Sequence, residues 1–212
     1  MPGSDTSARA LIVIPARFGS TRLPGKPLLA IAGRTLLERV LANARAAARV
    51  AGNCEIVVAT DDKRIANHAK ELGACVAMTS PDCNSGSARA FAAAQQQASR
   101  PAHVINLQGD APFVAPATIA LLIGALRTGS ADVATPVYRL DWARLDRLRA
   151  HKLAAPFSGT TCVRDAEGRA MWFSKSILPA IRDEARLRGE SGVSPVWQHL
   201  GLYAYRMAAL EW

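Results

Sequence analysis

The stretch of sequence that decides the fold class is EIVVAT-DDKRIANHAKEL-G-ACVAMT, which covers residues 55–79. Its two outer parts, residues 55–60 and 74–79, are short apolar runs of strand length. Residues 62–72 between them have a helical pattern. A strand, a helix and a second strand in this order predict a βαβ unit, in which the two strands run parallel.

The same alternation continues through most of the chain. Near-continuous apolar strands are expected where helices cover both faces of a parallel sheet. We therefore expect an α/β fold, with a Rossmann-like, mostly parallel sheet and helices on both of its faces. Further strands are predicted at residues 10–15, 103–108 and 132–138, and further helices at residues 35–50, 87–98 and 116–128.

The pattern changes after about residue 139. Residues 162–164 and 170–174 flank the turn sequence Asp-Ala-Glu-Gly-Arg, so we predict a hairpin and with it an antiparallel insert. Residues 200–205 predict a returning strand. From Met207 onward a helix has room for barely one turn. We expect its apolar residues Met207, Leu210 and Trp212 to lack a following segment against which to pack.

Length and charge narrow the class of protein. The 212 residues are close to the ~100 to 200 typical of one domain, so we expect a single domain over residues 1–212. Lys and Arg number 26 against 17 Asp and Glu, and the net charge of +9 favours anionic partners such as phosphates or sugar acids. The positive charges form no run of five and few aromatic residues lie among them, which argues against nucleic acid as a partner.

Cysteine spacing and the first residues indicate a cytoplasmic protein. The four cysteines show no spacing typical of a metal site, so a reduced chain is the simpler interpretation. The first ten residues lack a basic start followed by an apolar run, and the first apolar stretch is far too short to span a bilayer. We expect no membrane partner.

The most informative loop is IPARFGSTRLPGKPL, residues 14–28. It leaves the first strand at its carboxyl end, where open α/β sheets bind ligands. Arg17, Arg22 and Lys26 can neutralise phosphate charge, and the glycines let backbone N–H groups approach. The loop therefore predicts a triphosphate site, with a solvated basic loop as the alternative. It matches neither the Walker A pattern nor the Gly-x-Gly-x-x-Gly fingerprint.

Two further segments carry polar side chains at the expected ligand edge. Asp110 follows a buried strand and a glycine, and its carboxylate suits Mg²⁺ held against phosphate oxygens, although a plain turn aspartate is the alternative. Gln108 can bond ribose or sugar, or only backbone. Residues 84–89, NSGSAR, open a helix and form a polar socket of N–H groups, hydroxyls and an Arg. For its serines the alternative is a simple N-cap.

The loop resembles the signature R-x-x-S-T-R-L-P-G-K-P-L of the CMP-Kdo synthetases, the 3-deoxy-manno-octulosonate cytidylyltransferases. The likeness continues in order and covers residues 11–206. Residues 56–61 look like the second strand of the family and its acidic end. The stretches N-x-Q-G-D, Y-F-S-R and H-x-G-x-Y-x-Y-R are matched at residues 106–110, 172–175 and 199–206.

This resemblance implies that CTP and 3-deoxy-manno-octulosonate (Kdo) react to give CMP-Kdo and pyrophosphate, for lipopolysaccharide or capsule biosynthesis. It implies Mg²⁺ at Asp110, catalytic roles for Arg17, Arg22, Lys26 and Asp110, and CTP and an acidic sugar as partners. A homodimer is an open alternative to a monomer. The implied nucleotide-binding residues are Pro15, Ala16, Arg17, Ser20, Arg22, Lys26, Ser85, Gly86, Arg89 and Gln108, and the implied sugar-binding residues are Lys175, His199 and Tyr203.

Some positions depart from the family pattern. The family's H-x-S-G-T-D/E-R segment lies over the cytosine, and here Cys83, Ser87 and Ala88 differ from it. Ala111 stands where the family commonly has an acid, and the family continues beyond the Tyr-x-Tyr-Arg strand into segments that supply a second metal-binding Asp. These departures keep two alternatives open: a nucleotide-binding paralogue with impaired catalysis, and a cytidylyltransferase for another acidic sugar. In the 212-residue chain, CTP binding is expected to survive better than turnover.

Overall fold

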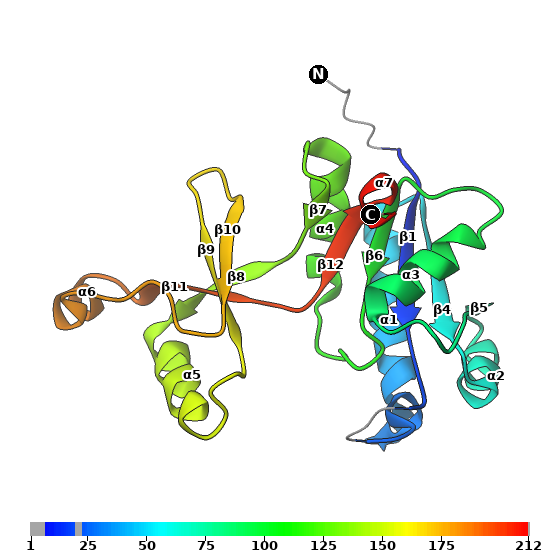
Figure 1. The fold of residues 1–212 in the computed structure, drawn as a ribbon, viewed down its shortest axis with the longest axis horizontal. Helices are drawn as coiled ribbons and strands as arrows, with labels where there is room; N and C mark the ends of the chain where they lie inside the picture. Colours follow the sequence, from blue (N-terminus) through cyan, green and yellow to red (C-terminus); the bar gives the residue numbers. More distant parts are fainter. Residues whose placement is uncertain (1–6, 20–22, 212) are drawn as a thin grey trace. The chain divides into compact units, whose positions relative to one another are not determined.

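The computed structural model describes residues 7–19 and 23–211, which form two compact units (Figure 1). The first unit contains the chain up to Ala134 and again from Leu202, and the second unit is Thr135–Gly201. The single domain expected over residues 1–212 stays a prediction. No helix within the described residues is both long and apolar enough to cross a membrane.

A six-stranded sheet forms the centre of the first unit, and its four parallel strands confirm the predicted fold class. The fifth and sixth strands are each antiparallel to their neighbour. The order across the sheet is β5 (Cys75–Met78), β4 (Cys54–Thr60), β1 (Ala10–Pro15), β6 (His103–Asn106), β12 (Tyr203–Arg206) and β7 (Val133–Ala134).

Helices cover both faces of this sheet (Figure 1). On one face, α1 (Leu36–Ala51) and α4 (Pro116–Thr128) pack against each other and against the strands, and α2 (Lys63–Glu71) contacts β4 and β5. On the other face, α3 (Gly86–Gln95) packs on β1, β4 and β6. All four helices correspond to predicted ones. Short segments complete the unit: η1 (Lys26–Leu28) and the small hairpin of β2 (Ala30–Ile31) and β3 (Arg34–Thr35).

The core under α3 explains why this helix is rich in alanine. Ala90, Ala93 and Ala94 are at most 1% exposed and pack on Leu11 and other strand residues. Small side chains let the helix backbone approach the sheet closely, and the larger strand side chains fill the space that remains. The helix therefore holds its N-terminus at a fixed place over the carboxyl end of β1.

The last helix, α7 (Met207–Leu210), bears on one expectation. It is one turn long, as predicted, but Met207 is 4% exposed and belongs to the core under α3, and Leu210 packs against the same core. These two side chains therefore pack on the α3 face of the sheet, a partner that the prediction, which considered only a following segment, did not include. Trp212, named with them, lies outside the described residues.

The second unit is an antiparallel sheet with the order β10, β9, β11, β8, which confirms the predicted insert. Strands β9 (Thr160–Arg164) and β10 (Ala170–Ser174) form the predicted hairpin, and β11 (Val193–His199) pairs with β9 and with β8 (Val137–Asp141). Helices α5 (Trp142–Ala154) and α6 (Glu184–Glu190) were not predicted. An apolar cluster of Leu140, Leu145, Val196 and neighbouring side chains joins α5 to the sheet.

The strand predicted at residues 132–138 is in fact two strands. Val133–Ala134 is β7 of the first unit, and Val137–Asp141 is β8 of the second. Pro136 separates them, because proline has no N–H to donate to a sheet and restricts the backbone of the residue before it. The apolar run conceals this boundary.

Candidate nucleotide site

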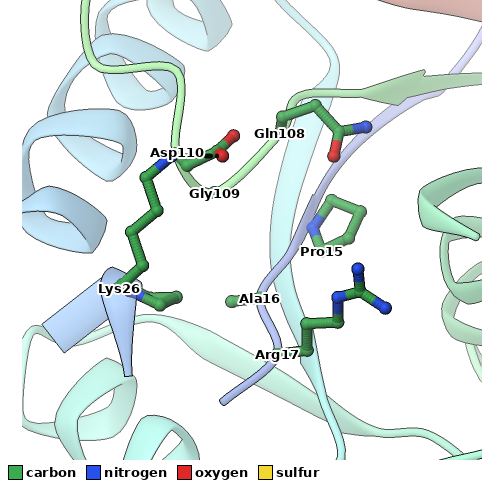
Figure 2. A pocket seen from close by; sticks show the side chains of 8 residues that line it. Pro15, Ala16, Arg17, Lys26, Gln108, Gly109 and Asp110 are labelled. Carbon is green, nitrogen blue, oxygen red and sulfur yellow. Dashed lines mark hydrogen bonds and ion pairs between the residues drawn. The ribbon is translucent and has the colours of Figure 1, made fainter. Parts of the chain in front are cut away.

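A groove in the first unit lies where β1 and β6 end and α3 begins. Two adjoining hollows share Pro15, Ala16, Arg17 and Gln108. Figure 2 shows the first hollow, which Lys26, Pro27, Gly109 and Asp110 complete. The second hollow is completed by Cys83, Asn84, Ser85, Gly86 and Arg89. The structure thus brings together the described members of the predicted nucleotide-binding set, while Ser20 and Arg22 lie outside the described residues.

Gly109 allows the ends of two strands to meet. Its N–H donates to the carbonyl oxygen of Pro15 at 3.1 Å. A Cβ atom on Gly109 would lie 2.7 Å from that same backbone oxygen, closer than real side chains come. Only glycine therefore lets the segment after β6 lie against the end of β1, and this contact brings Asp110 to the groove.

Lys26 and Asp110 form an ion pair at the edge of the groove. The Nζ atom of Lys26 donates to a carboxylate oxygen of Asp110 at 2.7 Å, although the residues are 84 positions apart (Figure 2). The side chains are 36% and 49% exposed, so a ligand in the groove can reach both. A cation and an anion side by side suit a ligand made of phosphate groups and a metal ion, since each partner can bind one of them.

The basic loop is held at its base by Phe18. The N–H of Gly25 donates to the carbonyl oxygen of Phe18 at 2.9 Å, and Gly25 has a positive φ of 69°. A Cβ atom there would lie 2.8 Å from the Phe18 ring, so glycine is required for both reasons. The guanidinium carbon of Arg64, from α2, lies 3.3 Å from the centre of the same ring. These contacts place Lys26, which directly follows Gly25.

At the start of α3, Ser85 has the capping role that was the simpler alternative for it. Its side-chain oxygen accepts the N–H of Ala88 at 3.0 Å, and the residue is exposed at the groove. Its predicted contact with nucleotide stays a prediction. The unpaired N–H groups of a helix N-terminus favour an anion or a polar acceptor in the adjacent hollow.

Arg89 lies beneath the second hollow and is already paired. It is 2% exposed, and its guanidinium donates to Thr79 Oγ1 at 2.5 Å and to Asp61 at 3.0 Å. These bonds hold the base of the hollow together, and they also engage the carboxylate of Asp61. A buried ion pair of this kind is costly to break from one side, because the remaining charge is left without a partner.

The side chains at the groove fit a Mg²⁺ ion that is bound partly by the protein and partly by the phosphates of a substrate, rather than one enclosed by protein side chains. Among the described residues, no group of three or more His, Cys, Asp or Glu side chains could hold a metal. Asp110 therefore offers one carboxylate. Mg²⁺ commonly keeps several waters and is bound by one or two carboxylates together with substrate phosphates. Asp110 can hold the ion in this way when a triphosphate lies beside Lys26.

A row of hydrogen bonds extends from the groove into the protein, and the sequence did not predict it. Gln108 Nε2 donates to Asn106 Oδ1 at 2.9 Å, and Asn106 Nδ2 donates to Ser87 Oγ at 3.2 Å. Ser87 Oγ in turn lies 3.1 Å from the Tyr205 hydroxyl. Asn106 is the residue from which the sequence could have indicated this row of hydrogen bonds. It is a polar residue within a strand, and a buried polar group needs a hydrogen-bond partner.

The predicted sugar-binding residues occur in both units. Tyr203, in the first unit, stacks on Tyr205 with ring centres 6.1 Å apart. Burial and the neighbouring Tyr205 raise the pKa of Tyr203. Lys175 and His199 lie in the second unit, where Lys175 Nζ donates to Thr160 Oγ1 at 2.8 Å. Their contact with sugar stays a prediction.

His199 is a half-buried residue at one end of the second sheet. Its Nε2 lies 2.8 Å from Thr135 Oγ1, and its ring meets Phe173 edge-on at 5.0 Å. Burial and then the positive charge of Lys175 lower the pKa of His199. The imidazole is therefore neutral near pH 7 and can accept or donate a hydrogen bond.

An open parallel sheet with a polar groove at the carboxyl ends of its strands is the arrangement in which many α/β proteins bind nucleotides. A family model described as cytidylyltransferase matches residues 11–211. The chain belongs to the cytidylyltransferase family.

Individual relatives agree with this assignment. The 3-deoxy-manno-octulosonate cytidylyltransferase of Maricaulis maris is 44% identical over 202 residues, which are 95% of this chain and 74% of the relative. The enzyme of the same name from Chlamydia pneumoniae is 35% identical over 99% of this chain and 76% of its own length. These relatives confirm the predicted likeness to the CMP-Kdo synthetases.

Solved structures give the same result. The structure of CMP:2-keto-3-deoxy-manno-octonic acid synthetase complexed with CTP matches with a TM-score of 0.78 at 34% identity, and the match covers 96% of this chain and 76% of that one. A 4-diphosphocytidyl-2C-methyl-D-erythritol synthase from Anaerococcus prevotii matches with a TM-score of 0.55 at 14% identity, which shows a shared fold.

Proposed function

We propose that this protein is a nucleotidyltransferase that forms CMP-Kdo and pyrophosphate from CTP and 3-deoxy-manno-octulosonate, with Mg²⁺ as its metal ion. The observation that carries the proposal is the ion pair of Lys26 and Asp110 at the nucleotide groove of a chain 44% identical to an enzyme of that name. The product is a precursor for lipopolysaccharide or capsule, and the place of action is the cytoplasm, where CTP is made.

The reaction is an in-line displacement at the α-phosphorus of CTP. The anomeric hydroxyl of Kdo forms the new bond to phosphorus, the bond from the α-phosphorus to the bridging oxygen breaks, and pyrophosphate leaves with the bonding electrons. The hydroxyl proton is released to solvent. Positioning and neutralisation of charge account for most of the catalysis in reactions of this kind.

The described residues divide the work along the groove. Lys26, with Arg17 nearby, neutralises the β- and γ-phosphates, and the N-terminus of α3 lies beside the nucleoside part. Arg22 has the same proposed role as Lys26. Asp110 would hold the metal ion, which, when bound, would supply positive charge at the reacting phosphate and lower the pKa of the attacking hydroxyl.

The test is pyrophosphate release measured with a panel of acceptors and nucleotides. We expect release with CTP and Kdo in the presence of Mg²⁺, and much less with UTP, with N-acetylneuraminic acid or with glucose. Pyrophosphate release with another acidic sugar, and not with Kdo, would show that this other sugar is the acceptor. CTP binding without release from any acceptor would leave the impaired nucleotide-binding paralogue as the better account.

Oligomeric state is a separate question, because the proposed groove is formed within the first unit of a single chain. We propose a homodimer, in line with the family resemblance. Light scattering at several protein concentrations tests it: a mass of twice 22.5 kDa supports the dimer and a mass of 22.5 kDa contradicts it.

A further inference from the structure

The hydrogen bonds between Gln108 and Tyr205 form one continuous row across three elements. Gln108 follows β6, Asn106 ends β6, Ser87 is in the first turn of α3, and Tyr205 is in β12. The three contacts are 2.9, 3.2 and 3.1 Å long. Asn106 at the centre is 2% exposed, so its amide has little access to water in place of these partners.

In the structure, the row engages one end of the Gln108 amide and leaves the other end to a ligand. Its Nε2 donates to Asn106 Oδ1, and Asn106 can act as acceptor there because its own Nδ2 is directed to Ser87. With Asn106 held in this orientation, turning the Gln108 amide over would place its oxygen against the oxygen of Asn106, which is repulsive. The Gln108 oxygen Oε1 is therefore the atom left to accept a hydrogen bond in the groove.

Gly86 restricts the same amide from another side. A Cβ atom on Gly86 would lie 2.7 Å from Gln108 Nε2 and 3.1 Å from Oε1. The amide thus packs against the bare backbone at the start of α3. Gln108 lines both hollows of the groove, so an atom held in this way faces the space that both parts of a ligand would share.

We propose that Ser87 and Tyr205 are positioning residues that act through Asn106 on Gln108, whose Oε1 accepts a hydrogen bond from a ligand hydroxyl. This inference rests on the proposed function. The hydroxyl belongs either to the ribose of CTP or to the acidic sugar, because both present hydroxyl groups and the groove receives both. Neither Ser87 nor Tyr205 touches the ligand in this account.

A double-mutant cycle in steady-state kinetics tests the coupling. Removing one hydrogen bond from such a row costs about 0.5 to 1.5 kcal/mol, so we expect Ser87→Ala and Tyr205→Phe each to lower kcat/KM by about two- to tenfold. In a Gln108→Ala background the same changes should have little further effect. Ser87→Thr, which keeps the hydroxyl, should restore the rate. Equal losses with and without Gln108 would overturn the proposal.

Two additional arms separate the source of the hydroxyl. If it is the ribose, Ser87→Ala weakens CTP binding in calorimetry and has no effect on the binding of the 2′- or 3′-deoxy nucleotide that lacks that hydroxyl. If it belongs to the sugar, the loss appears in the KM for Kdo while CTP affinity is unchanged. Either result supports the proposal. If Ser87→Ala changes neither CTP affinity nor the KM for Kdo, the proposal is overturned.

A spectroscopic arm works even if the proposed reaction is wrong. The side-chain amide signals of Gln108, assigned by their absence in Gln108→Glu, should shift in Ser87→Ala and stay close to wild type in Ser87→Thr. The matched control is Tyr138→Phe, which removes a tyrosine hydroxyl that donates to a glutamine, Gln198, at 2.9 Å in the second unit. Unchanged Gln108 signals in Ser87→Ala would overturn the proposal independently of turnover.

Discussion

The Nζ atom of Lys26 lies 2.7 Å from a carboxylate oxygen of Asp110, and the two residues come from different segments that line the same hollow. Lys26 is placed by the basic loop after β1, and Asp110 by the close contact of Gly109 with Pro15. The pair joins the predicted phosphate-binding and metal-binding parts of the site. A triphosphate with its metal ion would replace this ion pair with one interaction at each residue, which makes both residues suitable for mutation.

Replacing Lys26 by alanine should weaken binding of CTP much more than binding of CMP. The ammonium group is expected to contact the β- and γ-phosphates, which CMP lacks, and a charged hydrogen bond is worth about 1.5 to 3 kcal/mol. Calorimetry should therefore show at least a roughly tenfold weaker CTP affinity and a nearly unchanged CMP affinity. Lys70→Ala, an exposed lysine of α2, is the control. Equal losses for both nucleotides would reject the phosphate role.

Replacing Asp110 by asparagine should keep the fold and remove the dependence on Mg²⁺. The amide has the same shape but lacks the charge that a hard cation prefers. A metal ion at the reacting phosphate contributes several kcal/mol, so turnover should fall by about a hundredfold or more. Asp132→Asn, an exposed aspartate before β7, serves as the matched change. An unaltered Mg²⁺ titration in the Asp110 variant would place the metal elsewhere.

Two glycine replacements should have opposite effects on stability. In Gly109→Ala the new Cβ would meet the Pro15 oxygen at 2.7 Å, and overpacking of this kind costs about 1 to 3 kcal/mol. In Gly124→Ala, inside α4, nothing lies within 4 Å, and alanine favours a helix by up to about 1 kcal/mol. Thermal denaturation should give a lower Tm for the first variant and an equal or higher Tm for the second. A wild-type Tm in Gly109→Ala would contradict the close approach.

The pKa of His199 gives a prediction about acid stability. In the folded chain this pKa lies below its ordinary value of 6.5, mainly because of burial. Below pH 6.5 the unfolded chain therefore binds more protons than the folded one, and stability falls as the pH decreases through 6.5 until the folded-state pKa is reached. NMR titration should show the lowered pKa, and Lys175→Met should raise it by the smaller, electrostatic part. A pKa of 6.5 or above in the wild type would contradict the burial argument.

The sequence predicted the parallel part of the fold well because helices cover both faces of that sheet. A strand such as residues 10–15 is then almost entirely apolar and stands out from its surroundings. Helix α5 escaped prediction for the opposite reason. In its sequence, WARLDRLRAHKLA, only Trp142, Leu145 and Leu148 are buried. The many charged residues between them make this apolar helix face hard to recognise in the sequence. The break at Pro136 was concealed by an apolar run on both of its sides.

For the site, the sequence could indicate which residues face the groove but not how each is bonded. The loop signature and the Gln-Gly-Asp stretch indicated Lys26 and Asp110, and both line the groove in the structure. Their roles in binding stay predictions. Arg89 was predicted as a nucleotide ligand, and only the structure shows that its guanidinium turns inward to Asp61 and Thr79. Contacts between residues so far apart in sequence depend on packing, which a motif does not record.

³¹P NMR of the reaction mixture shows whether CMP is transferred from CTP to Kdo in this groove. Incubation of the protein with CTP, Kdo and Mg²⁺ should give a phosphodiester signal of CMP-Kdo together with an equal amount of pyrophosphate. Under the same conditions Asp110→Asn should give neither within the time that the wild type needs for completion. A mixture in which CTP binds but its three phosphate signals persist, or in which CMP appears without a sugar conjugate, would contradict the proposed transfer.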